Sequence, residues 1–171
     1  MTRRPESSEY APYYGKYVAL VPDGDIAVTL SRQIDATAAF LSPLSEQQAA
    51  YAYAPGKWSI KEVLGHLMDT ERIFTYRALR IGRNDKTPLP GYEQDDYVAS
   101  ANFNGRSLSG LLEEFAAVRN STVQLFKHFT DKEWERRGTA NQVEMTALSL
   151  GYVVAGHELH HMDVVRKRYL G

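Results

Sequence analysis

The chain reads LGYVVAGHELHHMDVV over residues 150–165, and this stretch decides the fold. Its apolar residues and two of its histidines recur at steps of three or four residues: Leu150, Val153, Val154, His157, His161, Val164 and Val165. This period is typical of an amphipathic helix, and it places His157 and His161 within the inward-facing stripe. We expect the helix to extend from about Met145 to Tyr169.

Three more segments show a helical period and begin at a residue suited to capping a helix. In one of them, Ser59 and Glu62 have the spacing of a capping box, in which each side chain accepts a hydrogen bond from the other residue's backbone N–H. We expect helices from Asp23 or Asp25 to about Leu41, from Ser59 to about Ile81, and from Ser107 to about Phe129. Because the chain has no alternating strand pattern, it is predicted to be an all-α bundle of four long helices.

The segments outside these helices lack a helical period and contain most of the prolines. Residues 1–22 are expected to form an N-terminal arm that lies across the surface. Residues 82–106 are expected to form a long loop with a short turn near residues 95–101. A second capping-box sequence, Thr130 to Glu133, predicts a short helical turn before Gly138. At 171 residues, with 43% hydrophobic residues, the chain fits a single helical domain over residues 1–171.

The composition excludes several classes of function. The net charge of −1 at pH 7 gives no electrostatic reason to expect nucleic acid or an anionic membrane as a partner. No apolar run is long enough to span a membrane and no signal region follows the N-terminal residues, so we expect a cytoplasmic protein. The chain contains no cysteine, so the ligands of any metal ion must be histidines or carboxylates.

Residues 157–161 match the H-E-x-x-H pattern of zinc peptidases, in which the glutamate is the general base. In the extended form of that pattern a glycine and a third histidine follow, but Val164 and Lys167 occupy those positions. Asp163 is the only acidic side chain after His161, and a glutamate on a further helix would need a longer chain. We therefore reject the peptidase interpretation and expect a third ligand from upstream.

Two histidines lie upstream, His66 and His128. His66 lies on or beside the buried stripe of its predicted helix, whereas His128 lies in the last helical turn, where an imidazolium stabilises the helix end. We select His66 as the third ligand, together with His157 and His161. His160 points about 60° away from His157 and is expected at the edge of the site. Three buried imidazoles need a common polar partner, and three histidine ligands leave a coordination position open, as in catalytic metal sites.

Three segments of the chain carry a resemblance to a known family. They are Pro55-Gly56-Lys57-Trp58-Ser59 leading into Gly65-His66-Leu67-Met68-Asp69-Thr70-Glu71, the loop Pro88-Leu89-Pro90-Gly91-Tyr92 with Asp95-Asp96, and Ala155-Gly156-His157-Glu158-Leu159-His160-His161-Met162. Over residues 25–170 the chain resembles the DinB-like superfamily of four-helix-bundle metalloenzymes, close to its YfiT-type branch. The resemblance implies an up-down-down-up bundle, and one divalent metal ion, nickel or zinc, bound by His66, His157 and His161. The long connection 82–106 agrees with the crossover that this topology needs.

The resemblance implies a metal-dependent enzyme that acts on a small molecule, and three functions stay open. The first is hydrolysis by activated water, with Glu158 either as the general base or as a solvated or outer carboxylate. The second is transfer of a low-molecular-weight thiol such as bacillithiol or mycothiol, which needs no cysteine in the protein. The third is a non-catalytic, metal-binding bundle of a stress response. The family resemblance also implies a homodimer.

Other residues near the predicted site have roles that the sequence leaves open. Asp69 is either a hydrogen-bond acceptor for a histidine ligand or an ion-pair partner of Arg72 or Arg77. Three residues of the long loop are candidates for a lid over the pocket: Tyr92, Asp96 and Tyr97.

Overall fold

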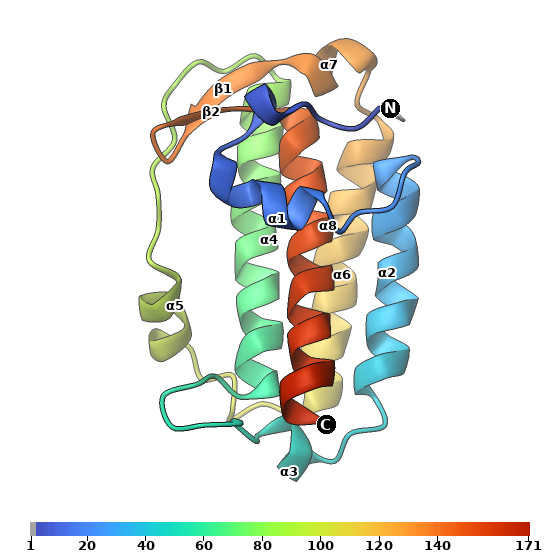
Figure 1. The fold of residues 1–171 in the computed structure, drawn as a ribbon, viewed down its shortest axis with the longest axis vertical. Helices are drawn as coiled ribbons and strands as arrows, with labels where there is room; N and C mark the ends of the chain where they lie inside the picture. The colour runs from blue at the N-terminus through green and yellow to red at the C-terminus, as the bar shows by residue number, and fades with distance from the viewer. Residues whose placement is uncertain (1–2) are drawn as a thin grey trace.

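The computed structural model describes residues 3–171, which form a bundle of long helices (Figure 1). The first two residues of the predicted N-terminal arm lie outside the described residues. The bundle consists of α2 (Ile26–Leu41), α4 (Ile60–Gly82), α6 (Leu108–Lys127) and α8 (Ala147–Val164). Shorter elements lie between them: α1 (Gly15–Val18), α3 (Glu46–Ala49), α5 (Gln94–Ser100), α7 (Asp131–Glu135), β1 (Arg137–Ala140) and β2 (Val143–Thr146). The predicted four-helix bundle is confirmed.

The directions of the four helices define the topology of the bundle. In Figure 1, α2 descends, α4 and α6 both ascend, and α8 descends. Because α4 and α6 run the same way, the chain between them has to return along the length of the bundle. Residues 83–107 make this return through α5, at the left of the view. The up-down-down-up arrangement and its long crossover are therefore confirmed.

Polar side chains cap α2, α4 and α6 at the predicted residues Asp25, Ser59 and Ser107. Asp25 Oδ1 accepts hydrogen bonds from the backbone N–H groups of Ala27 and Val28 at the start of α2. At the start of α4 the N–H of Glu62 donates to Ser59 Oγ over 3.1 Å, and the N–H of Ser59 donates to Glu62 Oε2 over 2.7 Å. Such caps satisfy N–H groups that the first helical turn leaves without a partner. They determine where each helix begins.

The last helix is shorter than predicted at both ends. It begins at Ala147 because Met145 belongs to β2, and it ends at Val164. Residues Val165–Tyr169 continue as a π-helical turn. The Tyr169 hydroxyl then donates to the carbonyl oxygen of Trp58 over 2.7 Å, which ties the end of the chain to the segment before α4.

A small β-hairpin contradicts the prediction that the chain has no strands. β1 pairs antiparallel with β2 through a two-residue turn. Both turn residues have positive φ, 50° at Asn141 and 64° at Gln142, as hairpin turns of this length require. Strands of four residues show little alternation, and this turn lacks the glycine that usually marks a hairpin in a sequence. The segment therefore carried no clear strand signal.

The N-terminal arm takes part in the hydrophobic core. Its helix α1 crosses the middle of α8 in Figure 1, and Tyr17, Val18 and Val21 are buried. The sequence predicted an arm without helical period that lies across the surface, whereas the structure has the helix α1 in this segment and buries part of it. The arm approaches α8 tightly at Gly156, where a Cβ atom would lie 2.0 Å from the carbonyl oxygen of Tyr17. Only a residue without a Cβ allows this contact.

Replacing Gly156 with alanine is expected to lower the free energy of unfolding by about 1–3 kcal/mol. The added methyl group would meet the backbone of Tyr17, which cannot rotate aside as a side chain can. Gly15→Ala is the matched control, because its Cβ would make an ordinary contact 3.7 Å from the Tyr10 ring. Urea denaturation measures both variants, and an equal loss in the two would argue against close packing of α1 on α8.

The buried core has two apolar ends and a polar layer between them. One apolar cluster includes Phe74 and Phe126, and the other includes Leu64 and Phe115. Each long helix contributes buried polar side chains at the level between these clusters: Gln33 and Thr37 from α2, His66, Thr70 and Glu71 from α4, Arg119 and Thr122 from α6, and His157 and Glu158 from α8. Buried polar groups are costly unless they are paired. This layer is therefore a candidate functional site.

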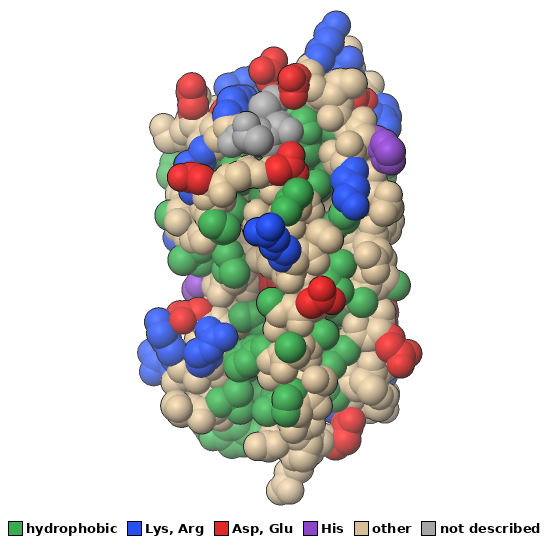
Figure 2. Space-filling model, turned by 90° about the vertical axis from the view of Figure 1, so that its right-hand side faces the viewer, with side chains coloured by type: hydrophobic (Ala, Val, Ile, Leu, Met, Phe, Trp, Pro, Cys, Tyr) green, Lys and Arg blue, Asp and Glu red, His purple; other side chains and the backbone are tan. Residues whose placement is uncertain are grey.

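The surface of the bundle is of mixed character. On the face shown in Figure 2, acidic and basic side chains are interspersed, and hydrophobic side chains gather over the lower half. None of the described helices is long and apolar enough to cross a lipid bilayer.

Candidate metal centre

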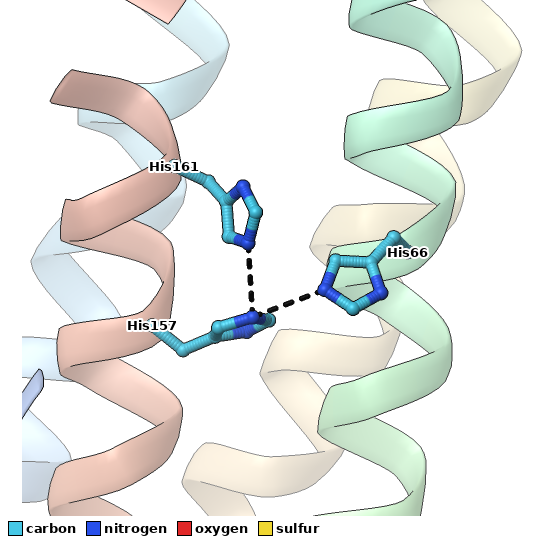
Figure 3. Close-up of side chains that lie close together, drawn as sticks. All are labelled: His66, His157 and His161. Carbon is cyan, nitrogen blue, oxygen red and sulfur yellow. Dashed lines mark hydrogen bonds between the residues drawn. The ribbon is translucent and has the colours of Figure 1, made fainter. Parts of the chain in front are cut away.

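Three histidines from two helices meet in the polar layer (Figure 3). His66 projects from α4, and His157 and His161 project from α8, one helical turn apart. The Nε2 atom of His157 lies 3.1 Å from Nε2 of His66 and 3.0 Å from Nε2 of His161. One ring nitrogen of each residue lies within 4.8 Å of those of the other two. The structure thus brings together the three residues selected from the sequence.

The spacing and chemistry of these nitrogens fit one divalent ion. Zinc binds histidine nitrogens at about 2.0–2.1 Å, so two nitrogens at tetrahedral positions around it are about 3.3 Å apart. The observed separations of 3.0 and 3.1 Å are close to that value. No carboxylate among residues 3–171 joins the group. Three protein nitrogens would leave a coordination position open for a further ligand.

The environment keeps the three imidazoles neutral, which is the state that binds a metal ion. Burial lowers the pKa of His66 to about 4 and that of His161 to about 3. Burial, with a further effect of the neighbouring histidines, lowers the pKa of His157 well below its usual value. The ring of Trp58 lies 4.8 Å from that of His66, and the ring of Tyr17 lies 5.3 Å from that of His157. These aromatic neighbours help to exclude water from the cluster.

The stability of the metal-free protein is expected to fall as the pH drops from about 6.5 to about 4. In the unfolded chain the histidines titrate near pH 6.5, whereas the folded-state pKa is about 4 for His66 and about 3 for His161. Between these values the unfolded state binds more protons. The free energy of unfolding therefore decreases with falling pH, by up to about 1.4 kcal/mol per pH unit for each histidine.

Urea denaturation with a chelator present measures this slope in the wild type and in His66→Gln. The variant should have the smaller slope. Equal slopes would mean that His66 is not buried in its neutral form.

Thr70 and Tyr92 orient the ring of His66. The Thr70 hydroxyl lies 3.3 Å from Nδ1 of His66 and 2.7 Å from the Tyr92 hydroxyl. When Nε2 faces a metal ion, Nδ1 carries the hydrogen and donates it to Thr70, whose own hydroxyl can donate to Tyr92. Of the two roles open to Asp69, the structure has the ion pair, with Arg72 at 3.4 Å. The four-residue spacing of His66 and Thr70 is the sequence signal for this contact.

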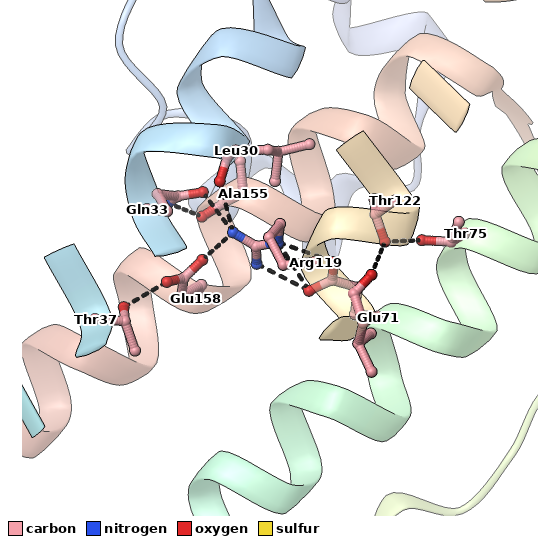
Figure 4. Close-up of polar contacts among 10 residues, drawn as sticks. Leu30, Gln33, Thr37, Glu71, Thr75, Arg119, Thr122, Ala155 and Glu158 are labelled. Atoms are coloured by element: carbon pink, nitrogen blue, oxygen red, sulfur yellow. Dashed lines mark hydrogen bonds and ion pairs between the residues drawn. The ribbon is translucent and has the colours of Figure 1, made fainter. Parts of the chain in front are cut away.

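Glu158, the glutamate of the H-E-x-x-H pattern, lies in the core between α8, α2 and α6 (Figure 4). It is only 2% exposed, so the interpretation as a solvated carboxylate is wrong. The Thr37 hydroxyl donates to its Oε1 over 2.5 Å, and Arg119 forms an ion pair with its Oε2 at 2.6 Å. Burial raises the pKa of Glu158, and the nearby Arg119 and Thr37 oppose that effect.

Arg119 is the centre of a buried ion cluster that connects the four long helices (Figure 4). Its Nε and Nη2 donate to the carboxylate of Glu71 over 2.9–3.0 Å, and Nη1 also donates to Gln33 Oε1 over 3.3 Å. Burial lowers the pKa of Arg119, but the carboxylates of Glu71 and Glu158 more than offset this and raise it. Sequence reasoning missed this cluster, which lies next to the histidines in the polar layer.

The remaining histidines lie outside the cluster of three. His160 is partly exposed, and its ring lies 5.4 Å from that of Tyr17, at the edge of the site as expected. His128 is exposed where α6 ends.

Two hollows border the histidines. One, of about 290 Å³, is lined by Thr70, Arg77 and His157 together with tyrosines of the N-terminal arm and the crossover. The other, of about 260 Å³, borders His161. Asp95 of α5 lines both. A small molecule could therefore approach the histidine cluster from outside.

The predicted lid residues differ in their positions. Tyr92 lines the larger hollow, and the ring of Tyr97 lies 5.2 Å from that of Tyr92. Asp96 is exposed, and it is the neighbouring Asp95 that reaches the hollow.

The fold and the site define a class of protein: an up-down-down-up four-helix bundle with a largely buried cluster of three histidines suited to one metal ion. Residues 29–165 match the model of the DinB superfamily, and the chain belongs to this family. The chain is 20% identical over 129 residues to "Putative metal-dependent hydrolase OB0413" of Oceanobacillus iheyensis, with 74% of this chain and 73% of that protein covered. Its fold is similar to that of YfiT from Bacillus subtilis, which has an unusual four-helix bundle topology. The TM-score is 0.72 at 18% identity, and 96% of this chain and 93% of the other are covered.

Proposed function

We propose that the protein is a metal-dependent hydrolase of small molecules, with His66, His157 and His161 as the ligands of one divalent ion. The observation that carries this proposal is the convergence of three imidazole nitrogens within 4.8 Å of one another, from two buried histidines, His66 and His157, and the partly buried His161. The hydrolase named among the relatives supports it. Imidazole ligands suit nickel and zinc, which are the two metals that we propose. A cytoplasmic location and a homodimer stay predictions from the sequence.

The residues around the histidines are arranged in a way that suits metal-dependent hydrolysis. A divalent ion held by three neutral imidazoles supplies Lewis acidity and lowers the pKa of water. The Thr70 and Tyr92 hydroxyls hold the His66 ring with Nε2 toward the other histidines. Tyr17 and Trp58 cover the rings of His157 and His66. The larger hollow provides room for a small substrate beside His157.

For Glu158 we propose a positioning role in place of the general-base role suggested by the sequence pattern. Both of its carboxylate oxygens are engaged, by Thr37 and Arg119. We expect Glu158→Gln to keep the pH–rate profile of hydrolysis while lowering the free energy of unfolding. Loss of a general base would instead remove a limb of that profile and lower the rate by about 10²–10⁴-fold. Stopped assays from pH 5.5 to 9 measure the difference.

The test of the proposed function is hydrolysis of a panel of esters and amides without added thiol. The protein is stripped with a chelator and reloaded with zinc or nickel. Turnover should appear only in the reloaded wild type and be absent in His157→Ala. Turnover that persists after stripping would contradict a metal-dependent reaction. A reaction that needs bacillithiol or mycothiol and an electrophile would instead identify a thiol transferase, and inactivity with every substrate would favour the non-catalytic alternative.

A further inference from the structure

Arg77 is a buried cation without a carboxylate partner among residues 3–171. Its side chain is 3% exposed, and its one hydrogen bond within the described chain is from Nη2 to the carbonyl oxygen of Pro90, over 2.7 Å. The other deeply buried arginine, Arg119, pairs with two carboxylates. Buried arginines are almost always paired, because a charge without a counter-ion is costly away from water. Arg77 therefore lacks the counter-ion that a buried arginine usually has within the described chain.

Arg77 belongs to the lining of the larger hollow. Its Cζ is 5.3 Å from the centre of the Phe74 ring and 5.9 Å from that of the Tyr92 ring. Aromatic contacts of this kind leave the N–H groups at the edge of a guanidinium available to a ligand. Burial lowers the pKa of Arg77, because the charged form is less stable away from water. An anionic oxygen group from outside the chain would stabilise this charged form.

The same hollow joins Arg77 to the histidine cluster. Both Thr70, which contacts His66, and His157 line it. Along α4, Arg77 follows His66 by eleven residues, about 16 Å of helix rise. The hollow of about 290 Å³ therefore has a cationic end at Arg77 and a metal-binding end at His157. A small molecule held at the first end would extend toward the second.

The other charged and titratable groups near the hollow do not neutralise the charge at its Arg77 end. Glu93 and Asp95 belong to its lining, but both are exposed, so water screens their charges. Burial raises the pKa of Tyr14 and that of Tyr92, so these phenols stay neutral and can donate hydrogen bonds. Lys16 lies over the ring of Tyr13 at 3.9 Å and adds a second cation near the arm.

We propose that Arg77 binds an anionic oxygen group of the substrate, a carboxylate or a phosphate, at the end of the hollow opposite the histidines. Arg77 would thus be a specificity-determining residue that selects anionic small molecules over neutral ones of the same shape. A guanidinium accommodates both groups through paired hydrogen bonds. The inference rests on the proposed function only in assuming that the bound molecule is a substrate that reacts at the histidines. Binding of the anion by Arg77 does not depend on that reaction.

The test compares three probes of similar shape: benzoate, phenyl phosphate and the neutral benzamide. Calorimetric titration measures their dissociation constants with the protein loaded with zinc and stripped with a chelator. The stripped protein is needed because an anion can also bind a metal ion directly. We expect at least one anion to bind the stripped wild type about tenfold or more tightly than benzamide, a difference typical of charge-assisted hydrogen bonds. The tighter of the two anions then identifies the group.

Arg77→Met should abolish the preference for the anion, and Arg77→Lys should retain part of it. Arg72→Met is the matched control, since Arg72 lies on the same helix, is exposed and does not line this hollow. It should keep the wild-type preference. Far-UV circular dichroism checks that each variant is folded.

Equal binding of anions and benzamide to the stripped wild type, or no binding of any probe, would overturn the proposal without requiring a variant. So would a folded Arg77→Met protein that keeps the preference. Because these measurements need no metal and no turnover, their failure is distinct from failure of the proposed hydrolase function.

Discussion

Replacing Arg119 with methionine is expected to lower the free energy of unfolding by about 3–5 kcal/mol. The substitution removes the cation from between two buried carboxylates, Glu71 at 3% and Glu158 at 2% exposure. A buried ion pair contributes little net stability compared with an apolar replacement, but removing one partner leaves an uncompensated charge in the core. Urea denaturation at neutral pH, with the metal ion absent, measures the loss.

Two comparisons distinguish this mechanism from a general loss of packing. Arg106→Met removes an exposed arginine that pairs with Glu114 at 2.5 Å, and such surface pairs contribute at most about 1 kcal/mol. The triple variant Arg119→Met, Glu71→Gln, Glu158→Gln removes the whole ionic cluster and should recover part of the stability lost by Arg119→Met alone. If Arg119→Met lowers the free energy of unfolding by no more than Arg106→Met does, the charges of the cluster do not account for its contribution to stability.

The ion cluster also bears on the metal centre. Glu158 follows His157 directly in α8, and its carboxylate is held by Arg119 from α6 and Thr37 from α2. These contacts fix the rotation of α8 at the point where His157 has to face His66. Glu71 plays the corresponding part in α4, one residue after Thr70. The buried charges thus align the two helices that carry the histidines.

The sequence was sufficient for the long helices and for the three histidines because both depend on local periodicity. Caps such as Ser59 with Glu62 and the spacing of His157 and His161 need no knowledge of neighbouring helices. The position of His66 on a buried stripe was enough to select it over His128.

Features that depend on the packing of several helices could not be predicted from the local sequence pattern. Arg119 lies at four-residue steps from Phe115 and Val123, so its inward position could have been read from the sequence. Its partners could not, because Glu71 and Glu158 come from two other helices whose relative rotation the pattern leaves open. The contact of α1 with Gly156 depends in the same way on the path of the arm.

Substituting any one of His66, His157 and His161 with alanine is expected to lower the affinity for zinc or nickel by more than about 100-fold. Changes to the residues that merely support a metal ligand cost 10–100-fold, so loss of a ligand should cost more. The wild type should contain about one ion per chain, measured by elemental analysis of untagged protein. Competition with a chromophoric chelator then gives the affinity of each variant.

Two other histidines provide matched controls for this measurement. His160→Ala removes a neighbouring imidazole at the edge of the site, and His128→Ala removes an exposed one just after α6. Both should bind metal as the wild type does.

A second measurement separates loss of a ligand from loss of the fold. An ion that binds only the folded state raises the free energy of unfolding by about 2.7 kcal/mol when its concentration is 100 times the dissociation constant. The wild type and both controls should gain this stability on adding zinc, and the three ligand variants should not, although they remain folded without it. If the wild type binds no stoichiometric ion, the proposal of a metal centre is wrong. If His66→Ala keeps the wild-type affinity, His66 is not a ligand of the ion.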